Sequence, residues 1–218
     1  TGCGTGSVNE WQYIEELPSV KNESEIQTTG SFNPSKGRKE TISQVKILPD
    51  GSKGIFLSVG DSRQGWVDAF RKLLTFYTES TFSSFPLIEV DLSQVRRAGI
   101  RLSQFGGVAN PIELPDMFHR LGRLLNKIAR RENPSFTPED VCLLNDIPGR
   151  AIVAGNIRRK AGMQLFPSDY PLLKNNLWQP GADGVWRIDP ERAPLEMSNH
   201  TRIFHRKPTL AELEESVE

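Results

Sequence analysis

Residues 149–161 limit the possible folds and functions of this chain more than any other segment. They form an apolar segment of β character that a Gly-Asn pair interrupts. Its apolar residues favour a strand ending at Gly155 and Asn156, where a glycine lets the backbone approach a ligand closely. Arg158 and Arg159 follow, and two adjacent guanidinium groups offer rigid forks for phosphate oxygens. The alternative interpretation is a surface turn whose charged side chains are solvated.

A second segment with the same chemistry lies upstream. Residues 95–102 hold Arg96, Arg97 and Arg101, and Gly106 and Gly107 follow soon after. This repetition of arginines beside glycines favours phosphate binding over a solvated turn at both places.

The composition excludes several classes of protein. Of the 218 residues, 37% are hydrophobic and 25% charged, which permits a packed core. A net charge of zero argues against non-specific binding to nucleic acid or an anionic membrane. Two cysteines are too few for a disulfide framework or a zinc cluster and fit the reducing cytoplasm. Without an apolar run near the roughly 20 residues of a membrane span, no membrane contact is expected.

Helix and strand signals alternate along the chain, which predicts an α/β fold. Residues 62–77, 114–131, 137–147 and a segment from Thr209 onward have helical patterns, with Thr137 and Thr209 as N-caps. Strands are expected at 41–48 and 54–59, which form a hairpin, and at 86–92 and 152–154. Polar residues 22–39 and the Gly- and Pro-rich residues 178–189 are expected to be loops.

The two longest helices each have one apolar face. In residues 62–77 an aromatic stripe at spacings of three and four predicts core packing, above all for Phe70, Leu73 and Leu74, with Trp66 and Tyr77 on the same face. In residues 114–131 the inward set is Phe118, Leu121, Leu125 and Ile128, and a solvated face is expected for Arg120, Arg123, Lys127, Arg130 and Arg131.

Five blocks resemble, in order, the motifs of the adenosylcobalamin (B12)-dependent, class II ribonucleotide reductases. Residues 1–7 are similar to a glycine-rich GxGVG strand end, and residues 60–67 to a GDSxEGW segment. Residues 95–109 resemble the arginine and FGGTASG block, and residues 149–161 the GxxVVAGNVRRSA block. Residues 197–201 are similar to an SNNS turn. The chain departs from these motifs at Val108-Ala109-Asn110 and at Lys160-Ala161-Gly162.

The resemblance implies part of a ten-stranded α/β barrel with an inserted effector-binding subdomain. Residues 1–9 would be a barrel strand end with its glycine-rich loop, 10–89 the inserted subdomain, and 90–218 a barrel portion with a specificity loop. The chain would be a central fragment of a monomeric ribonucleoside-triphosphate reductase. That enzyme makes deoxyribonucleotides by a radical mechanism, with adenosylcobalamin, bound mainly outside this fragment, and a thioredoxin-like reductant.

The resemblance also implies two groups of site residues. The deoxynucleotide effector would contact Asp61, Ser62, Arg63, Arg96 and Arg101, with Asp61 accepting from the ribose and the following helix N-terminus favouring phosphate. The alternative role for Asp61 and Ser62 is helix capping. The specificity loop, between effector and substrate base, would comprise Gly155, Asn156, Ile157, Arg158, Arg159 and Lys160.

No catalytic residue or metal ligand is expected in this chain. Cys3 and Cys142 match none of the family's catalytic cysteines, so the fragment alone should be inactive, and Cys142 is expected to be buried on the apolar side of a helix. The spacing of His119, His200 and His205 predicts no metal site. Two other functions stay open: a non-catalytic nucleotide-binding module that retains the allosteric loops, and an oligomerisation or phosphate-binding domain without a link to reduction.

Overall fold

The computed structural model describes residues 3–102, 107–154, 157–158, 160–170 and 177–215. They divide into two compact units. The first contains residues 18–135 and 150–159, and the second contains residues 2–17, 136–149 and 160–218. Helices, parallel strand pairs and antiparallel pairs occur together, so the predicted α/β class is confirmed. No described helix is long and apolar enough to cross a membrane.

The first unit is built on a four-stranded mixed sheet with the order β2-β5-β4-β3. Its strands are β2 (Glu25–Thr29), β3 (Ile42–Ile47), β4 (Lys53–Ser58) and β5 (Leu87–Asp91). The β3–β4 pair is the predicted hairpin, whereas β2 and β4 both run parallel to β5. The short β6 (Val153–Ala154) and β7 (Ile157–Arg158) pair antiparallel.

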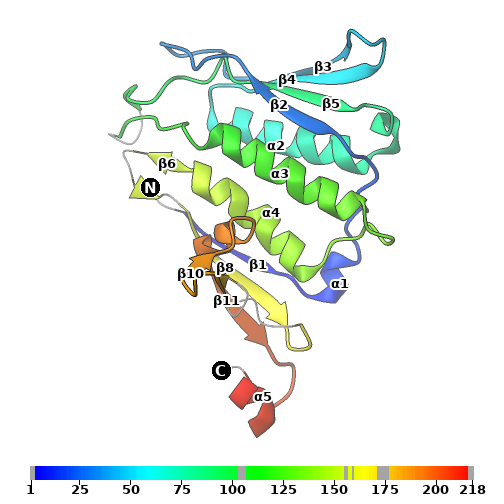
Figure 1. Cartoon of the computed structure of the whole chain (residues 1–218). Coiled ribbons are helices and arrows are strands. Elements are labelled where there is room, and N and C mark those ends of the chain that lie inside the picture. The colour runs from blue at the N-terminus through cyan, green and yellow to red at the C-terminus, as the bar shows by residue number, and fades with distance from the viewer. Residues whose placement is uncertain (1–2, 103–106, 155–156, 159, 171–176, 216–218) are drawn as a thin grey trace. The chain divides into compact units, whose positions relative to one another are not determined.

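Two helices lie along one side of this sheet (Figure 1). They are α2 (Arg63–Thr78), followed by the 3-10 turn η1 (Ser80–Phe82), and α3 (Leu114–Ala129). The predicted inward residues of α3 are all fully buried: Phe118, Leu121, Leu125 and Ile128. The buried apolar residues at alternate positions of the sheet are Ile26, Ile55, Leu57, Ile88 and Val90. On the opposite face of the sheet, Lys46 forms an ion pair with Glu89 and lies over the ring of Phe56.

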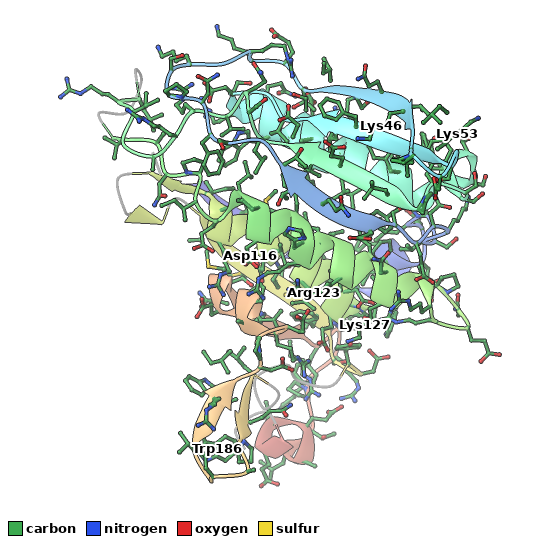
Figure 2. The ribbon with its side chains drawn as sticks, turned by 45° about the horizontal axis from the view of Figure 1, so that its top comes forward. Lys46, Lys53, Asp116, Arg123, Lys127 and Trp186 are labelled. Carbon is green, nitrogen blue, oxygen red and sulfur yellow. The ribbon has the colours of Figure 1, made fainter. Side chains whose placement is uncertain are left out.

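The opposite face of α3 is charged, as predicted. One of its arginines, however, is not solvated as predicted. Asp116, Arg123 and Lys127 project from α3 in Figure 2, and Arg123 and Lys127 are exposed. Arg120 differs, because its side chain is only 17% exposed and its Nε donates to Asp116 Oδ2 at 2.6 Å. An i,i+4 carboxylate thus draws this guanidinium onto the helix surface.

The second unit contains a parallel three-stranded sheet with β8 (Lys160–Pro167) between β1 (Cys3–Val8) and β11 (Ser198–Ile203). It also holds α1 (Trp11–Ile14), the 3-10 turn η3 (Ala193–Met197), α5 (Leu210–Glu215) and most of α4 (Pro138–Ala151). A hairpin joins β9 (Trp178–Pro180) to β10 (Trp186–Ile188). Trp186 on this hairpin is 61% exposed (Figure 2).

Four sequence predictions about elements were wrong. Residues 149–151 end helix α4 instead of starting a strand, because the helix continues past Pro148. The expected loop at 22–39 contains β2, whose one buried apolar residue, Ile26, gives a weak signal. The expected loop at 178–189 is the β9–β10 hairpin, turned by Asp183 and Gly184 at φ 75°. The expected turn at 197–201 belongs largely to β11.

The core face of α2 also differs from the prediction. Its buried residues are Gly65, Ala69, Leu73, Phe76 and Tyr77. Trp66, Phe70 and Leu74 are only half-buried. Two small residues, Gly65 and Ala69, thus belong to the packed face, and a pattern built on large apolar side chains does not include them.

Candidate functional site

The residues predicted to contact an effector meet at the N-terminus of α2. Ser62 caps this helix, because its Oγ accepts from the backbone N–H of Gly65 at 2.9 Å. The same hydroxyl donates to the carbonyl of Lys39 at 2.7 Å. Of the two capping candidates, Ser62 therefore fills the position, and the carboxylate of Asp61 is engaged elsewhere.

Asp61 forms a buried ion pair with Arg96. Arg96 Nε lies 2.8 Å from Asp61 Oδ1 and 3.0 Å from Oδ2, and Arg96 Nη2 donates to the Asp61 carbonyl at 3.3 Å. The carboxylate also accepts from the backbone N–H groups of Gly37 and Arg96, each at 3.2 Å. The side chains of Asp61 and Arg96 are only 5% and 16% exposed. The structure thus joins two predicted site residues that are 35 positions apart.

Gly60 and Gly65, on either side of Asp61, leave room for a neighbouring backbone segment, residues 37–41. A Cβ on Gly60 would lie 2.2 Å from the Lys39 carbonyl oxygen, and one on Gly65 would lie 2.6 Å from it. Thr41 holds the same segment in place, since its Oγ1 accepts from Gly60 N and donates to the Gly65 carbonyl. The Gly60–Gly65 spacing therefore serves close backbone packing around the Asp61 carboxylate.

The other predicted effector residues are more open. Arg63 and Arg101 are both exposed. The backbone of Arg101 forms an isolated antiparallel β-bridge with Val108. Nearby, the backbone N–H of Gly99, whose φ is 88°, donates to the carbonyl of Ala109. Gly99 thus adopts the left-handed backbone conformation, which favours glycine at this position.

The predicted specificity loop is described only in part. Gly155, Asn156 and Arg159 lie outside the described residues. The backbones of Ile157 and Arg158 form β7, and Lys160 begins β8.

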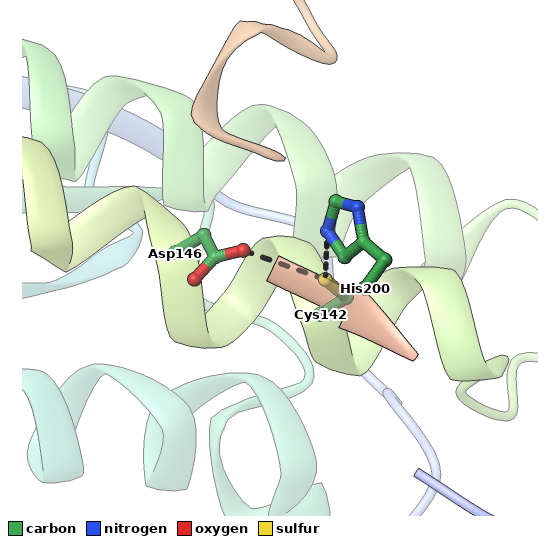
Figure 3. A group of neighbouring side chains, drawn as sticks. All are labelled: Cys142, Asp146 and His200. Carbon is green, nitrogen blue, oxygen red and sulfur yellow. Dashed lines mark hydrogen bonds between the residues drawn. The ribbon is translucent and has the colours of Figure 1, made fainter. Parts of the chain in front are cut away.

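A polar cluster that sequence reasoning missed lies in the second unit. Cys142 Sγ is 3.4 Å from Asp146 Oδ2 and 3.5 Å from His200 Nε2 (Figure 3). Cys142 and Asp146 are fully buried, and His200 is half-buried. The predicted burial of Cys142 is therefore confirmed, although its surroundings are polar. Burial lowers the pKa of His200, while the charge of Asp146 opposes this shift.

This cluster continues across the parallel sheet. Ser7, Gln164 and His200 are register partners on β1, β8 and β11. Gln164 Oε1 accepts from Asn9 Nδ2 at 2.9 Å, and Gln164 Nε2 donates to Asp146 Oδ1 at 3.4 Å. The spacing of Cys142 and Asp146, one helical turn apart, was the available signal, but His200 lies 58 positions from Cys142.

The comparisons with known proteins now identify the relatives. Residues 22–125 match the family model described as "B12-dependent ribonucleotide reductase, insertion domain". The resemblance to this family is confirmed. The matched range contains Asp61, Arg96 and Arg101, whereas the insertion expected from the sequence, residues 10–89, stays a prediction.

Curated relatives of this reductase family match over a wider range. An adenosylcobalamin-dependent ribonucleoside-triphosphate reductase of Lactobacillus delbrueckii subsp. bulgaricus is 32% identical over 77% of this chain. The protein of the same name from Lactobacillus acidophilus is 28% identical over 77% of it. A putative reductase of Mycobacterium phage D29 is 26% identical over 76% of it. The chain spans about a quarter of the length of these relatives, 23–25%. No solved structure matches.

The names of the relatives specify adenosylcobalamin as the cofactor. Among the described residues, the one group of potential metal-binding side chains is formed by Cys142 and Asp146 of α4 and His200 of β11, and two of these three residues are fully buried. We therefore assign no described residue to adenosylcobalamin.

Proposed function

We propose that this chain supplies the effector-binding and substrate-framing part of an adenosylcobalamin-dependent ribonucleoside-triphosphate reductase. The parent enzyme would reduce ribonucleotides to deoxyribonucleotides by a radical mechanism under deoxynucleotide control. The names of the relatives and the family match over residues 22–125 support this assignment. A ten-stranded barrel, a cytoplasmic location, a monomeric state and a thioredoxin-like reductant belong to the same proposal.

The observation that carries the effector role is the Asp61–Arg96 pair beside the N-terminus of α2. A helix N-terminus favours anions, and Arg96, held in a fixed orientation by the carboxylate, adds a preorganised guanidinium. Arg63 and Arg101 are exposed, so phosphate oxygens could approach both side chains from the solvent. In this proposal Asp61 therefore acts first by orienting Arg96.

A ribose contact with Asp61 is compatible with its bonds. A carboxylate has about four acceptor sites, and three N–H groups donate to this one: Gly37 N, Arg96 N and Arg96 Nε. A ribose hydroxyl would be the fourth donor. Because the side chain is only 5% exposed, the hydroxyl would reach a single edge of the carboxylate.

In the same proposal, Gly155 to Lys160 transmits the identity of the effector to the substrate base. Coupling between two nucleotide sites is reciprocal and typically about 1–3 kcal/mol. In the parent enzyme, Arg158→Ala and Arg159→Ala should therefore erode the effector's choice among substrates more than they weaken effector binding. An unchanged pattern of substrate preference in both variants, measured with competing nucleotides, would contradict the role of this loop.

The main alternative is a nucleotide-binding module without catalysis. Both functions require deoxynucleotide binding. They differ in whether the parent protein forms deoxynucleotides from ribonucleoside triphosphates when adenosylcobalamin and a dithiol are supplied.

Calorimetric titration of the chain with deoxynucleoside triphosphates tests the shared part of both functions. We expect saturable binding that weakens about tenfold or more in Arg101→Ala, since a charge-assisted hydrogen bond contributes about 1.5–3 kcal/mol. Arg97→Ala is the matched control, because Arg97 is an exposed neighbour outside the predicted set. Absence of binding by the wild-type chain, or equal losses in both variants, would refute the assignment of Arg101.

A further inference from the structure

We propose that Cys142, Asp146 and His200 form a structural site for a divalent transition-metal ion of the zinc type. The three potential ligand atoms all lie within 4.8 Å of one another. Figure 3 shows the sulfur of Cys142 between an oxygen of Asp146 and a nitrogen of His200. This site is separate from the effector residues and does not depend on the proposed function.

The distances within the cluster fit tetrahedral coordination. Zinc binds sulfur at about 2.3 Å and nitrogen or oxygen at about 2.0–2.2 Å, so tetrahedral angles place the sulfur about 3.5 Å from each of the other ligands. The observed separations from Cys142 Sγ are 3.4 Å to Asp146 Oδ2 and 3.5 Å to His200 Nε2. The two separations that involve the sulfur therefore match those of a tetrahedral site, and the carboxylate and imidazole ligand atoms lie within 4.8 Å of each other.

Two regular elements bring the ligands together. Cys142 and Asp146 are four residues apart on α4, so they lie one turn apart on the same face of the helix. Ser198 and His200 are two residues apart on β11, so they share one face of the strand. Ser198 Oγ donates to Asp146 Oδ2 and lies 3.4 Å from His200 Nε2, which places a hydroxyl beside the open coordination position.

Surrounding residues orient the ligands as outer-shell groups do in metal sites. Gln164 Nε2 donates to Asp146 Oδ1, the oxygen that does not face the sulfur. The ring of Phe166 packs edge-on against His200, with the centroids 5.7 Å apart. A carboxylate held by an amide and an imidazole held by an aromatic ring lose little freedom when an ion binds.

The donor set selects the class of metal. One sulfur, one nitrogen and one oxygen suit a borderline ion such as Zn²⁺, whereas Mg²⁺ and Ca²⁺ prefer oxygen ligands alone. Because Cys142 and Asp146 are fully buried, the role would be structural: the ion would link α4 to β11. The competing explanation is a hydrogen-bonded cluster with a protonated thiol, and the same distances suit it.

Cobalt titration distinguishes the two explanations, because a Co²⁺–thiolate bond gives a charge-transfer absorption band that a hydrogen bond cannot give. We expect the wild-type chain to bind one Co²⁺ with this band and added Zn²⁺ to displace it. Cys142→Ser should abolish the band, and His200→Gln should weaken binding by at least about 100-fold, because even outer-shell changes cost about 10–100-fold in affinity. Cys3→Ser and His205→Gln are the matched controls and should behave as wild type.

Three results would overturn the proposal: absence of saturable Co²⁺ or Zn²⁺ binding, a band that survives in Cys142→Ser, or a band lost in Cys3→Ser. If circular dichroism shows that Cys142→Ser is unfolded, a second measurement replaces it. The rate at which Cys142 reacts with a thiol reagent is then measured in the Cys3→Ser chain, with and without Zn²⁺. Zn²⁺ should slow this reaction at least tenfold, and Mg²⁺ should leave it unchanged. Equal rates with and without Zn²⁺ would leave only the hydrogen-bonded cluster.

Discussion

Removal of the Asp61 carboxylate should destabilise the first unit far more than removal of an exposed ion-pair partner. In Asp61→Ala, the Arg96 guanidinium would stay in a site where its side chain is only 16% exposed, and Gly37 N and Arg96 N would lose their acceptor. Breaking a buried pair typically costs about 3–5 kcal/mol. Because Arg96 keeps some access to water, we expect the lower end, about 3 kcal/mol, and a melting temperature lower by about 10 °C.

A double-mutant cycle measures the pair itself. Arg96→Ala alone leaves the carboxylate buried with its two backbone donors, so Asp61→Ala/Arg96→Ala should cost less than the sum of the single changes, with a coupling energy of about 2 kcal/mol. Urea unfolding followed by circular dichroism provides these free energies.

The matched control is Arg130→Ala, which breaks the exposed pair with Glu23 in the same unit. The two side chains of that pair are 68% and 46% exposed, and such pairs contribute about 0–1 kcal/mol. If Asp61→Ala costs no more than Arg130→Ala, or if the coupling is absent, the pair does not organise the start of α2. The orienting role of Asp61 in the proposed effector site would then fail as well.

Three further predictions concern single groups. Tyr77→Phe should lower the free energy of unfolding by only about 1 kcal/mol, because the Ser24 carbonyl, which accepts from the Tyr77 hydroxyl, also accepts from Asn126 Nδ2 at 2.9 Å. The control is Tyr13→Phe, since Tyr13 is exposed. A loss in urea unfolding that exceeds the loss of this control by about 3 kcal/mol or more would contradict the prediction. Gly60→Ala should destabilise by about 3 kcal/mol or more, because its Cβ would lie 2.2 Å from Lys39 O, whereas Gly4→Ala, with nothing within 4 Å, should be nearly neutral in thermal unfolding. Hydrogen bonds from Arg206 and Thr209 lower the pKa of Glu212 from 4.5 to about 2. The stability that Glu212 gives to the start of α5 should therefore be fully present above pH 4.5 and be lost as the pH falls from 4.5 through about 2. A carboxyl NMR titration of Glu212 that is unchanged by Arg206→Ala would disprove that cause.

Local signals predicted the parts of the fold that local physics determines. The N-caps at Thr137 and Thr209 are present, since each Oγ1 accepts from the residue three positions on, Asp140 or Glu212. The inward face of α3 followed from its spacing of apolar residues, because one helix face meets one sheet. The β3–β4 hairpin followed from its turn residues.

Elements that depend on distant partners could not be predicted in the same way. β2 has little apolar character and is a strand because it pairs with β5, some 60 residues later. The same reason hides the site chemistry. Asp61 finds Arg96 through the fold, and Cys142 finds His200 across 58 positions, so no window of sequence contains either pair. The site residues predicted by resemblance stay predictions, while these pairings emerge from the structure.

The parallel pairing of β1 with β8 has a consequence for the order of folding. Cys3 aligns with Lys160, and nearly all of the first unit, residues 18–135, lies between the two strands in the sequence. Closing so long a loop is entropically costly while the intervening chain is disordered, and contacts of high sequence separation form slowly. Residues 18–135 can instead nucleate from their own hairpin and helices, which shortens the effective separation between the strand ends. During synthesis, β1 would thus leave the ribosome before residues 18–135 and would pair with β8 only after those residues have condensed.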